Sequence, residues 1–335
     1  MIKLAINGFG RIGRSAFKIA FDRGDVDIVA INDLSDPATL AHLLKYDSNY
    51  GTYAKSVVAG EDKLKVDGKD IKILTEADPA KLPWRELDVD VVLECTGRFT
   101  DPEKASAHLD AGAKRVVLSA PAKGVKTVVL GVNEDSISKA DRIISNASCT
   151  TNCIAPVMKV LEDNIGIAKA MMTTVHSYTA SQRLQDAPAK DLREARNAAE
   201  NIVPTSTGAS RAAALTIPSL KDHFNGLSVR VPTPVVSLAD ITAVTKRHTT
   251  KEELISLFGS AAKEPYFQGI LSVTDKALVS SDFRGNSHSS IVDLSLTDVV
   301  DGDLIKIVAW YDNEWGYSNR LVEVAVDFAK LEQDF

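Results

Sequence analysis

Cysteine is scarce in this sequence, which has three such residues in a chain of 335: Cys95, Cys149 and Cys153. A small and odd number of cysteines in a chain of this length argues against a disulfide framework and favours reduced thiols in a cytoplasmic protein. Long apolar runs are also lacking, so we expect no membrane-spanning segment. The first residues, 1–8, predict a strand rather than a signal peptide.

Positive charge is not in excess either. Lys and Arg total 39 against 45 Asp and Glu, a net charge of −6. This balance argues against broad binding to nucleic-acid phosphates, so we expect no nucleic-acid partner. We also predict no metal site. Hydrophobic residues at 44% and charged residues at 25% are typical of a globular protein. The length is sufficient for two domains with cores of their own.

The segment around Cys149 carries the strongest chemical signal. A short β-prone run, residues 142–144, precedes it, and apolar residues with helical spacing follow it over residues 154–161. Cys149 is therefore predicted at a strand-to-helix junction, where unpaired N–H groups favour the thiolate over the thiol. A lone cysteine is more often a buried small hydrophobe, but the polar neighbours here favour a nucleophile. We interpret Cys95 and Cys153 as structural residues of the core.

A glycine-rich turn joins the first predicted strand, residues 3–7, to a helix that opens near Ser15. A second strand, residues 26–31, ends shortly before Asp33. The turn contains Gly8, Gly10 and Gly13. Glycines in this context let a pyrophosphate approach a helix N-terminus, and a carboxylate at Asp33 would accept from ribose hydroxyls. We predict a dinucleotide site that prefers NAD, because Asp33 would repel the 2′-phosphate of NADP.

Strands and helices continue to alternate in the first half, which predicts an α/β, doubly wound, Rossmann-type domain. Further strands are predicted at residues 89–95, 115–119 and 125–132, with a helix at 101–111. A hairpin at residues 63–74 interrupts the alternation and is expected to decorate the sheet with antiparallel strands. Thr96, Gly97 and Ser119 lie at the carboxyl ends of predicted strands, the edge where such sheets bind ligands.

The second half predicts an α+β domain with a mainly antiparallel sheet, because its strands are long. Strands are predicted at residues 169–177, 227–231, 235–246, 289–294 and 304–311, and helices at 209–215, 251–262 and 318–332. The last helix is expected to pack back on the first domain. We therefore assign residues 1–148 and 314–335 to an NAD-binding domain and residues 149–313 to a catalytic domain.

Three features of the second half could carry function. His176 lies near the end of a predicted strand; such a histidine is usually structural, but this one could meet Cys149 and act as its base. Residues 178–201 form a long polar loop, and loops of that length in a compact domain are usually functional. Residues 205–208 offer either an anion cradle at a helix start or ordinary N-caps.

These segments together resemble phosphorylating glyceraldehyde-3-phosphate dehydrogenases from end to end. The motifs that carry the resemblance are residues 7–14, 145–152, 175–179, 204–208, 230–234 and 310–317. The resemblance implies reversible, NAD-dependent oxidation and phosphorylation of D-glyceraldehyde 3-phosphate to 1,3-bisphosphoglycerate, through a hemithioacetal and a thioester on Cys149. It also implies a cytoplasmic glycolytic enzyme, usually a homotetramer in which the loop 178–201 packs near a neighbour's cofactor.

The motifs and the resemblance together assign roles to individual residues. Cys149 would be the nucleophile and His176 its base. The residues assigned to NAD are Gly8, Gly10, Arg11, Ile12, Gly13, Asp33, Thr96, Gly97, Ser119 and, for the nicotinamide amide, Asn313. The residues assigned to the substrate and to inorganic phosphate are Ser148, Thr150, Thr179, Thr207, Gly208 and Arg230.

One departure from the family reverses a charge. Glu194 follows Arg193 where the family usually carries two adjacent arginines, the second of which helps to bind phosphate. A carboxylate that points into the site would repel phosphate. Alternatively, a shifted loop would leave Glu194 facing water or paired with Arg193 or Arg196.

Two rival functions stay open. Erythrose-4-phosphate dehydrogenases share most of these motifs, although residues 149–151 and 205–208 favour the glyceraldehyde enzyme. A non-catalytic NAD-binding or redox-sensing protein would use the same reactive Cys149 without turnover. Against it, no motif residue needed for catalysis is missing.

Overall fold

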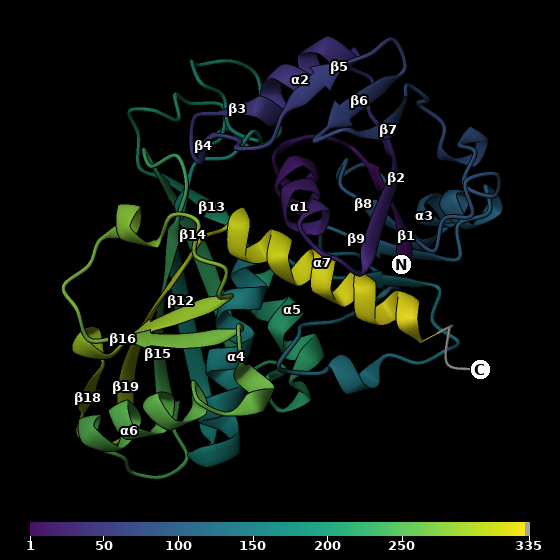
Figure 1. The fold of residues 1–335 in the computed structure, drawn as a ribbon. Coiled ribbons are helices and arrows are strands. Elements are labelled where there is room, and N and C mark those ends of the chain that lie inside the picture. The colour runs from purple at the N-terminus through teal and green to yellow at the C-terminus, as the bar shows by residue number, and fades with distance from the viewer. Residues whose placement is uncertain (332–335) are drawn as a thin grey trace. The chain divides into compact units, whose positions relative to one another are not determined.

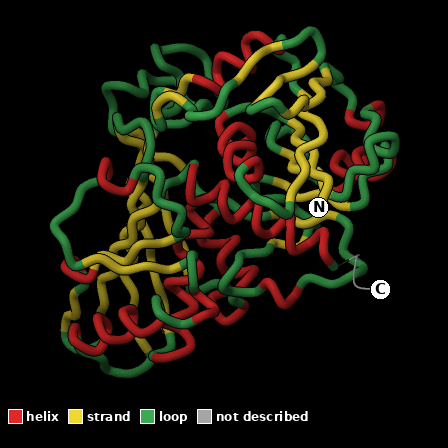
Figure 2. The backbone as a smooth tube through the Cα atoms, viewed as in Figure 1, coloured by secondary structure: helices red, strands yellow, loops and turns green. Residues whose placement is uncertain are grey.

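The computed structural model describes residues 1–331, and the chain divides into two compact units (Figure 1). The first unit comprises Met1–Val128, Asp135–Ala147 and, among the described residues, 318–331. The second unit comprises Val129–Glu134 and Ser148–Tyr317. Within the described part, each unit is built on one large sheet, whose strands are the yellow segments of Figure 2.

The strands of the first sheet are β1 (Ile2–Asn7), β2 (Val26–Asn32), β5 (Val57–Ala59), β6 (Lys63–Val66), β7 (Lys69–Leu74), β8 (Val91–Glu94), β9 (Arg115–Leu118), β10 (Lys126–Thr127) and β11 (Ile143–Ser145). Their order is β10-β11-β9-β8-β1-β2-β7-β6-β5. The central neighbours, from β10 to β7, pair in parallel. A short separate pair joins β3 (Tyr46–Asp47) to β4 (Gly51–Thr52). The predicted Rossmann-type α/β domain is confirmed.

The helices of this unit are α1 (Arg11–Phe21), α2 (Pro37–Lys45), α3 (Pro102–Asp110) and most of α7 (Trp315–Lys330). The first three residues of α7 belong to the second unit. The start of α3 follows from its sequence, because Asp101 accepts the N–H of Lys104 and Pro102 has no N–H to lose. The last helix begins three residues before its predicted start, and its predicted end at residue 332 lies outside the described residues. Its Phe328 ring lies 4.4 Å from the guanidinium carbon of Arg115 in the same unit.

Two predictions for the first sheet need correction. The hairpin β6–β7 is antiparallel as expected, but it is not a decoration, because β7 also pairs in parallel with β2 and buries Ile71 and Ile73. The strand predicted over residues 125–132 is reduced to β10, since the chain turns afterwards and reaches a φ of +76° at Gly131.

The strands of the second sheet are β12 (Ile167–Ser177), β13 (Val203–Ser206), β14 (Phe224–Val231), β15 (Ser237–Thr245), β16 (Leu271–Thr274), β17 (Ser290–Asp293), β18 (Asp298–Val300) and β19 (Leu304–Tyr311). Their order is β13-β14-β12-β15-β19-β17-β16, with β18 also on β19. The β12–β14 and β16–β17 pairs are parallel and the others antiparallel, so the predicted mainly antiparallel α+β domain is confirmed.

The helices of the second unit are α4 (Cys149–Asn164), α5 (Ala209–Thr216) and α6 (Lys251–Ala261). Helix α4 packs on the sheet and on α5, and buries the apolar stripe that predicted it. In the described chain, neither helix nor strand of regular type lies between Ser177 and Val203, which confirms the irregular loop. Thr205 and Ser206 belong to β13, so the predicted cradle at the start of α5 retains only Thr207 and Gly208.

Two kinds of feature are absent from residues 1–331. None of the helices there combines the length and apolar character that a membrane span requires. Nor do three or more His, Cys, Asp or Glu side chains of those residues gather as metal ligands would.

Candidate active site

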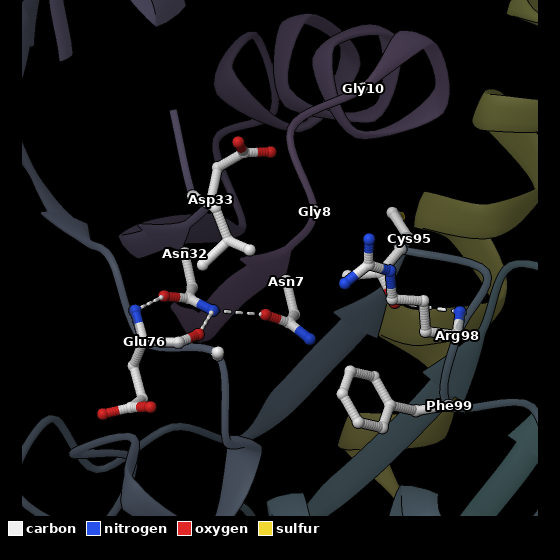
Figure 3. Close-up of a pocket in the computed structure, with 12 residues that line it drawn as sticks. Asn7, Gly8, Gly10, Asn32, Asp33, Glu76, Cys95, Arg98 and Phe99 are labelled. Atoms are coloured by element: carbon white, nitrogen blue, oxygen red, sulfur yellow. Dashed lines mark hydrogen bonds between the residues drawn. The ribbon is translucent and has the colours of Figure 1, made fainter. Parts of the chain in front are cut away.

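A cavity of about 310 Å³ opens at the carboxyl ends of the parallel strands in the first unit (Figure 3). It lies where β1, β2 and β8 end, which is the edge at which doubly wound sheets bind ligands. Four of the residues predicted to bind the cofactor line it: Gly8, Gly10, Asp33 and Thr96.

Two glycines of the turn beside this cavity have no room for side chains. Gly8 has a φ of +93°, and a Cβ there would lie 2.7 Å from the backbone nitrogen of Thr96. A Cβ on Gly13 would overlap the carbonyl oxygen of Gly8. Gly10 is the N-cap of α1, has open space beside it and provides no capping side chain. The first N–H groups of α1 are therefore accessible to an anion such as a pyrophosphate.

Asp33 connects the end of β2 to the glycine turn. Its Oδ2 accepts the N–H of Phe9 at 2.8 Å, and its Oδ1 accepts the N–H of Ser35 at 2.9 Å. Figure 3 shows the carboxylate directed toward the loop that carries Gly10. Each carboxylate oxygen has a further lone pair, which fits the hydroxyl donors of a ribose.

Sequence reasoning missed several residues that line the cavity. Asn32 donates to Asn7 Oδ1 at 2.7 Å, and the N–H of Glu76 donates to Asn32 Oδ1 at 2.9 Å (Figure 3). Both asparagines are the last residues of parallel strands, and that position is the signal that could have identified them. The other missed residues are Leu34, Ala77, Cys95, Arg98 and Phe99.

Cys95 was expected in the core, and this prediction is wrong. Strand β8 ends at Glu94, so Cys95 is the first residue after it. It is half-buried and lines the cavity. Desolvation by the surrounding protein, followed by the neighbouring Glu94 carboxylate, raises the pKa of its thiol to about 12. Cys153 is buried, as expected, and its thiol donates to Ser290 Oγ at 3.6 Å.

The remaining predicted cofactor residues of the first unit lie next to the cavity lining. Arg11 and Ile12 form the first turn of α1, and the Arg11 guanidinium lies 2.8 Å from a carboxylate oxygen of Asp47. Gly97 lies in the loop after β8 with a φ of +69°, and Ser119 directly follows β9. The side chain of Arg11 is therefore held by Asp47.

In the second unit, Cys149 and His176 meet. Cys149 is the first residue of α4, and His176 is the penultimate residue of β12. The Cys149 Sγ lies 3.5 Å from His176 Nε2. Ser148 sets the start of the helix, because its Oγ accepts the N–H of Thr151 at 3.1 Å. The strand-to-helix junction predicted from the sequence is therefore confirmed.

The charge state of this pair differs from the prediction. Burial raises the pKa of the Cys149 thiol, against an opposing effect of the Arg230 guanidinium. Burial and, second, Arg230 lower the pKa of His176 to about 3. Desolvation thus outweighs the helix N–H groups and favours the uncharged pair. Proton transfer from Sγ to Nε2 would create opposite charges 3.5 Å apart, whose attraction offsets part of that cost.

The other ring nitrogen of His176 has two neighbours: one accepts a hydrogen bond and the other donates one. Its Nδ1 lies 2.7 Å from the carbonyl oxygen of Ser177 and 2.5 Å from Nη1 of Arg230. A proton on Nδ1 would donate to the carbonyl and leave Nε2 as an acceptor facing Cys149. Arg230 is the register partner of His176 in the β12–β14 pair, which explains why its charge lies here.

Tyr311 is a buried neighbour of the pair that sequence reasoning missed. Its hydroxyl lies 2.9 Å from Thr150 Oγ1 and 2.8 Å from Thr174 Oγ1. Its ring meets the His176 imidazole edge to face, with 6.0 Å between centroids. Thr150, one of the predicted phosphate ligands, is therefore engaged by Tyr311 and ties the first turn of α4 to β19.

The other predicted substrate residues of the second unit lie at the ends of β12 and at the start of α5. Thr179 Oγ1 lies 3.0 Å from Ser181 Oγ. Thr207 Oγ1 accepts the N–H of Ala209 at 3.1 Å, and Gly208 is the N-cap of α5. Since Gly208 provides no capping side chain, the first N–H groups of α5 are available to an anion.

Glu194 points toward hydroxyl groups rather than toward the neighbouring arginines. Its Oε1 accepts from Thr205 Oγ1 at 3.4 Å and from Ser181 Oγ at 3.5 Å. Arg196 pairs instead with Asp186, at 2.8 Å. The alternative in which Glu194 pairs with Arg196 is therefore wrong.

Asn313 follows β19 and is buried. Its Oδ1 accepts from the hydroxyls of Ser177 and Ser237, each at 3.0 Å. The nitrogen of the same amide is thereby left to donate elsewhere.

The fold and these residues define a class: an NAD-dependent dehydrogenase with a Rossmann-type unit and a second unit that pairs a cysteine with a histidine. The family model described as the glyceraldehyde 3-phosphate dehydrogenase NAD binding domain matches residues 2–102. The model described as the C-terminal domain of the same family matches residues 148–313.

Several curated relatives, each named glyceraldehyde-3-phosphate dehydrogenase, are similar over nearly the whole chain. The protein of Borreliella burgdorferi is 53% identical over 98% of this chain and 100% of its own length. Those of Zymomonas mobilis and Geobacillus stearothermophilus are 53% and 52% identical, each over 98% of this chain. The chain belongs to the glyceraldehyde-3-phosphate dehydrogenase family.

Proposed function

We propose that this chain catalyses the NAD-dependent oxidative phosphorylation of D-glyceraldehyde 3-phosphate to 1,3-bisphosphoglycerate, a reversible step of glycolysis. The observation that best supports this is the 3.5 Å approach of Cys149 Sγ to His176 Nε2 at the start of a helix. The choice of aldehyde follows the relatives, which are named for glyceraldehyde 3-phosphate. Residues 1–148 and 314–335 would bind the cofactor, and residues 149–313 would carry out the chemistry.

In the first step, Cys149 attacks the aldehyde carbon and His176 takes the thiol proton. The S–C bond forms as the carbonyl π bond opens, and the new oxyanion receives the proton to give a hemithioacetal. The backbone N–H of Cys149 and the imidazole of His176 would stabilise that oxyanion. Burial and Arg230 lower the pKa of His176, so the imidazole is neutral before the reaction and its Nε2 lone pair faces the thiol. The attraction between the two charges formed by the transfer offsets part of the cost of protonating this weak base.

In the second step, His176 removes the proton of the hemithioacetal hydroxyl while the same carbon loses a hydride, which leaves a thioester on Cys149. When bound, NAD supplies the hydride acceptor in its nicotinamide ring. The amide of Asn313 would hold the carboxamide of that ring. Covalent attachment keeps the substrate carbon at a fixed place during this transfer.

In the third step, inorganic phosphate attacks the thioester carbon, the C–S bond breaks, and an acyl phosphate forms as product. The Cys149 thiolate that leaves takes back the proton held by His176, which restores the starting pair. The residues we assign to the incoming phosphate are Ser148, Thr207 and Gly208. The residues we assign to the phosphate of the substrate are Thr179 and Arg230. We also assign Thr150 to the binding of substrate and phosphate. Uncapped N–H groups at the start of α5 support the first assignment.

The assignment of the cofactor site rests on the cavity of the first unit. Gly8, Gly10 and Gly13, with the N–H groups of Arg11 and Ile12, would hold the pyrophosphate. Asp33 would bind the adenosine ribose and disfavour a 2′-phosphate, so NAD is the preferred cofactor. Thr96, Gly97 and Ser119, at neighbouring strand ends, would complete the site.

We also propose that the enzyme is a cytoplasmic homotetramer. Its three free thiols support a reducing compartment. Large apolar side chains exposed on the strands of the second sheet support association of subunits, and they are Met171, Val175, Leu227 and Leu304.

The proposed activity is tested by NADH absorbance with NAD, phosphate and either glyceraldehyde 3-phosphate or erythrose 4-phosphate. We expect the higher kcat/KM with glyceraldehyde 3-phosphate and no turnover by Cys149→Ser. A higher kcat/KM with the erythrose substrate would identify the rival enzyme. Absence of NADH with both aldehydes would support the non-catalytic alternative.

A further inference from the structure

Three neighbouring strands of the second unit bring two serines to the amide of Asn313. Ser177 ends β12, Ser237 begins β15, and Asn313 follows β19. The order β12-β15-β19 places these termini side by side. Ser177 is fully buried, and the other two side chains are 2% and 6% exposed. The Ser177 N–H also donates to Ser237 Oγ at 3.1 Å, which fixes the second hydroxyl.

The two serine hydroxyl protons decide which way the Asn313 amide is turned, because each proton needs an acceptor. With Oδ1 of Asn313 inward, it accepts from both Ser177 and Ser237 at 3.0 Å. If the amide were turned over, its nitrogen would donate to both serines. Their own protons would then have no acceptor within residues 1–331. Two buried unsatisfied hydroxyl protons are costly, so the inward oxygen is favoured.

The outward group of Asn313 is therefore the NH₂. Within residues 1–331, Nδ2 of Asn313 donates to no acceptor. Nor is Nδ2 one of the fully buried polar atoms that lack a partner. We propose that Ser177 and Ser237 are positioning residues that lock the Asn313 amide as a hydrogen-bond donor to the carboxamide oxygen of the nicotinamide. This inference rests on the proposed function, since it takes the nicotinamide as the ligand of Asn313.

The lock has a consequence for cofactor recognition. A donor fixed in advance binds a carbonyl oxygen without reorganising, whether that oxygen belongs to a carboxamide or to a ketone. Without the serines, the amide can turn over and present Oδ1, which still serves the NH₂ of a carboxamide. A ketone cannot donate to that oxygen. Loss of the lock should therefore penalise a ketone analogue more than NAD.

The test measures Kd by calorimetry for NAD and for its analogue in which a methyl ketone replaces the carboxamide. The variants are Ser177→Ala, Ser237→Ala and their combination, each made with Asn313 and with Asn313→Ala. Ser228→Ala is the control, because it removes a buried serine hydroxyl that has no partner in the same sheet. Thermal unfolding of each variant checks that it is folded.

We expect the combined serine variant to bind NAD about threefold and the ketone analogue about tenfold more weakly. In the Asn313→Ala background the same serine changes should have no further effect, because the serines act through that amide. Equal weakening in both backgrounds, or no more weakening than in Ser228→Ala, overturns the proposal. So does an unchanged Kd for Asn313→Ala itself. The NADH assay of the unaltered enzyme decides the proposed activity independently of these values.

Discussion

At the scale of single residues, the Arg230 guanidinium acts on both members of the Cys149–His176 pair. It lowers the pKa of the thiol and of the imidazole. Removing this cation should raise both pKa values, so thiolate forms only at higher pH. We expect Arg230→Gln to shift the pH profile of iodoacetamide alkylation of Cys149 upward by about one pH unit.

Arg230→Lys is the matched control, because it keeps the charge and should keep the profile near that of the unaltered protein. Cys95 and Cys153, whose thiol pKa values are raised to about 12, should label more slowly than Cys149 at every pH tested. An unshifted profile in Arg230→Gln, or labelling of the three thiols at equal rates, would contradict this account.

Glu194 is the second residue that invites a test. Its carboxylate accepts from Thr205 Oγ1, and Thr205 lies two residues before Thr207, a proposed ligand of the incoming phosphate. An anion beside this segment should weaken the binding of incoming phosphate. A charge reversal at this range is worth on the order of 1–3 kcal/mol. We expect a high phosphate KM that falls at least about tenfold in Glu194→Arg, measured with phosphate as the varied substrate.

Glu200→Arg makes the same charge change in the same loop, at an exposed side chain, and controls for the general effect of charge. A phosphate KM that changes equally in the two variants would show that Glu194 does not act at the site. Aldehyde KM should change less than phosphate KM in either variant.

At the scale of elements, a buried carboxylate links the strand ends around the cofactor cavity. Glu94, at the end of β8, accepts the N–H of Thr96 at 2.8 Å through Oε1. Its Oε2 lies 3.0 Å from Nε2 of His108 on α3, whose Nδ1 accepts from Trp84 at 2.9 Å. Because Trp84 occupies Nδ1, the proton of His108 is on Nε2 and donates to Glu94.

This network predicts that Glu94→Gln is destabilising, since an amide NH₂ would face one of these donors. We expect a loss of about 2–3 kcal/mol in the free energy of unfolding. NAD should also bind about tenfold more weakly, because Thr96 lines the cavity. Thermal unfolding and calorimetric titration would measure both. Glu103→Gln, on the exposed side of α3, should change neither value; equal effects in both variants would refute the network's role.

Long elements could be predicted from the sequence because periodicity and caps mark them, as for α4, whose N-cap is Ser148. Strands of two or three residues, such as β3 and β5, carry no periodicity and escaped prediction. The segment that became β13 contains Pro204, which argues against a strand. The proline is tolerated because β13 is an edge strand, with one side that does not pair with another strand.

In the candidate sites, too, the sequence predicts the features that depend on neighbouring residues and misses those that depend on distant contacts. The glycine turn and the junction at Cys149 depend on neighbours in sequence, so the sequence predicts them. Tyr311 meets Thr150, which is 161 positions away, only because β19 packs against α4. The charge state of Cys149 and His176 also depends on burial, which local sequence does not report. The helix start alone therefore describes only part of what sets the thiol pKa, because burial raises that pKa.

At the scale of the whole molecule, the second sheet exposes large apolar side chains that a stable subunit would be expected to cover. Met171 is 59% exposed and Leu227 is 43% exposed, on β12 and β14, which pair with each other. Contiguous apolar surface of this kind marks association sites. We expect light scattering at micromolar concentration to give four times the 36.1 kDa mass of the chain.

A charged substitution in that surface tests whether it is the contact. Met171→Asp would bury an unpaired carboxylate if the surface is covered by another copy, and the cost should exceed what the interface can offset. We expect this variant to scatter as a smaller species, while keeping its NAD affinity in the first unit. Val58→Asp is the control, because Val58 is also 59% exposed but lies on β5, at the edge of the other sheet. A monomeric mass for the unaltered protein would exclude the tetramer, and an unchanged tetramer in Met171→Asp would move the contact to another face.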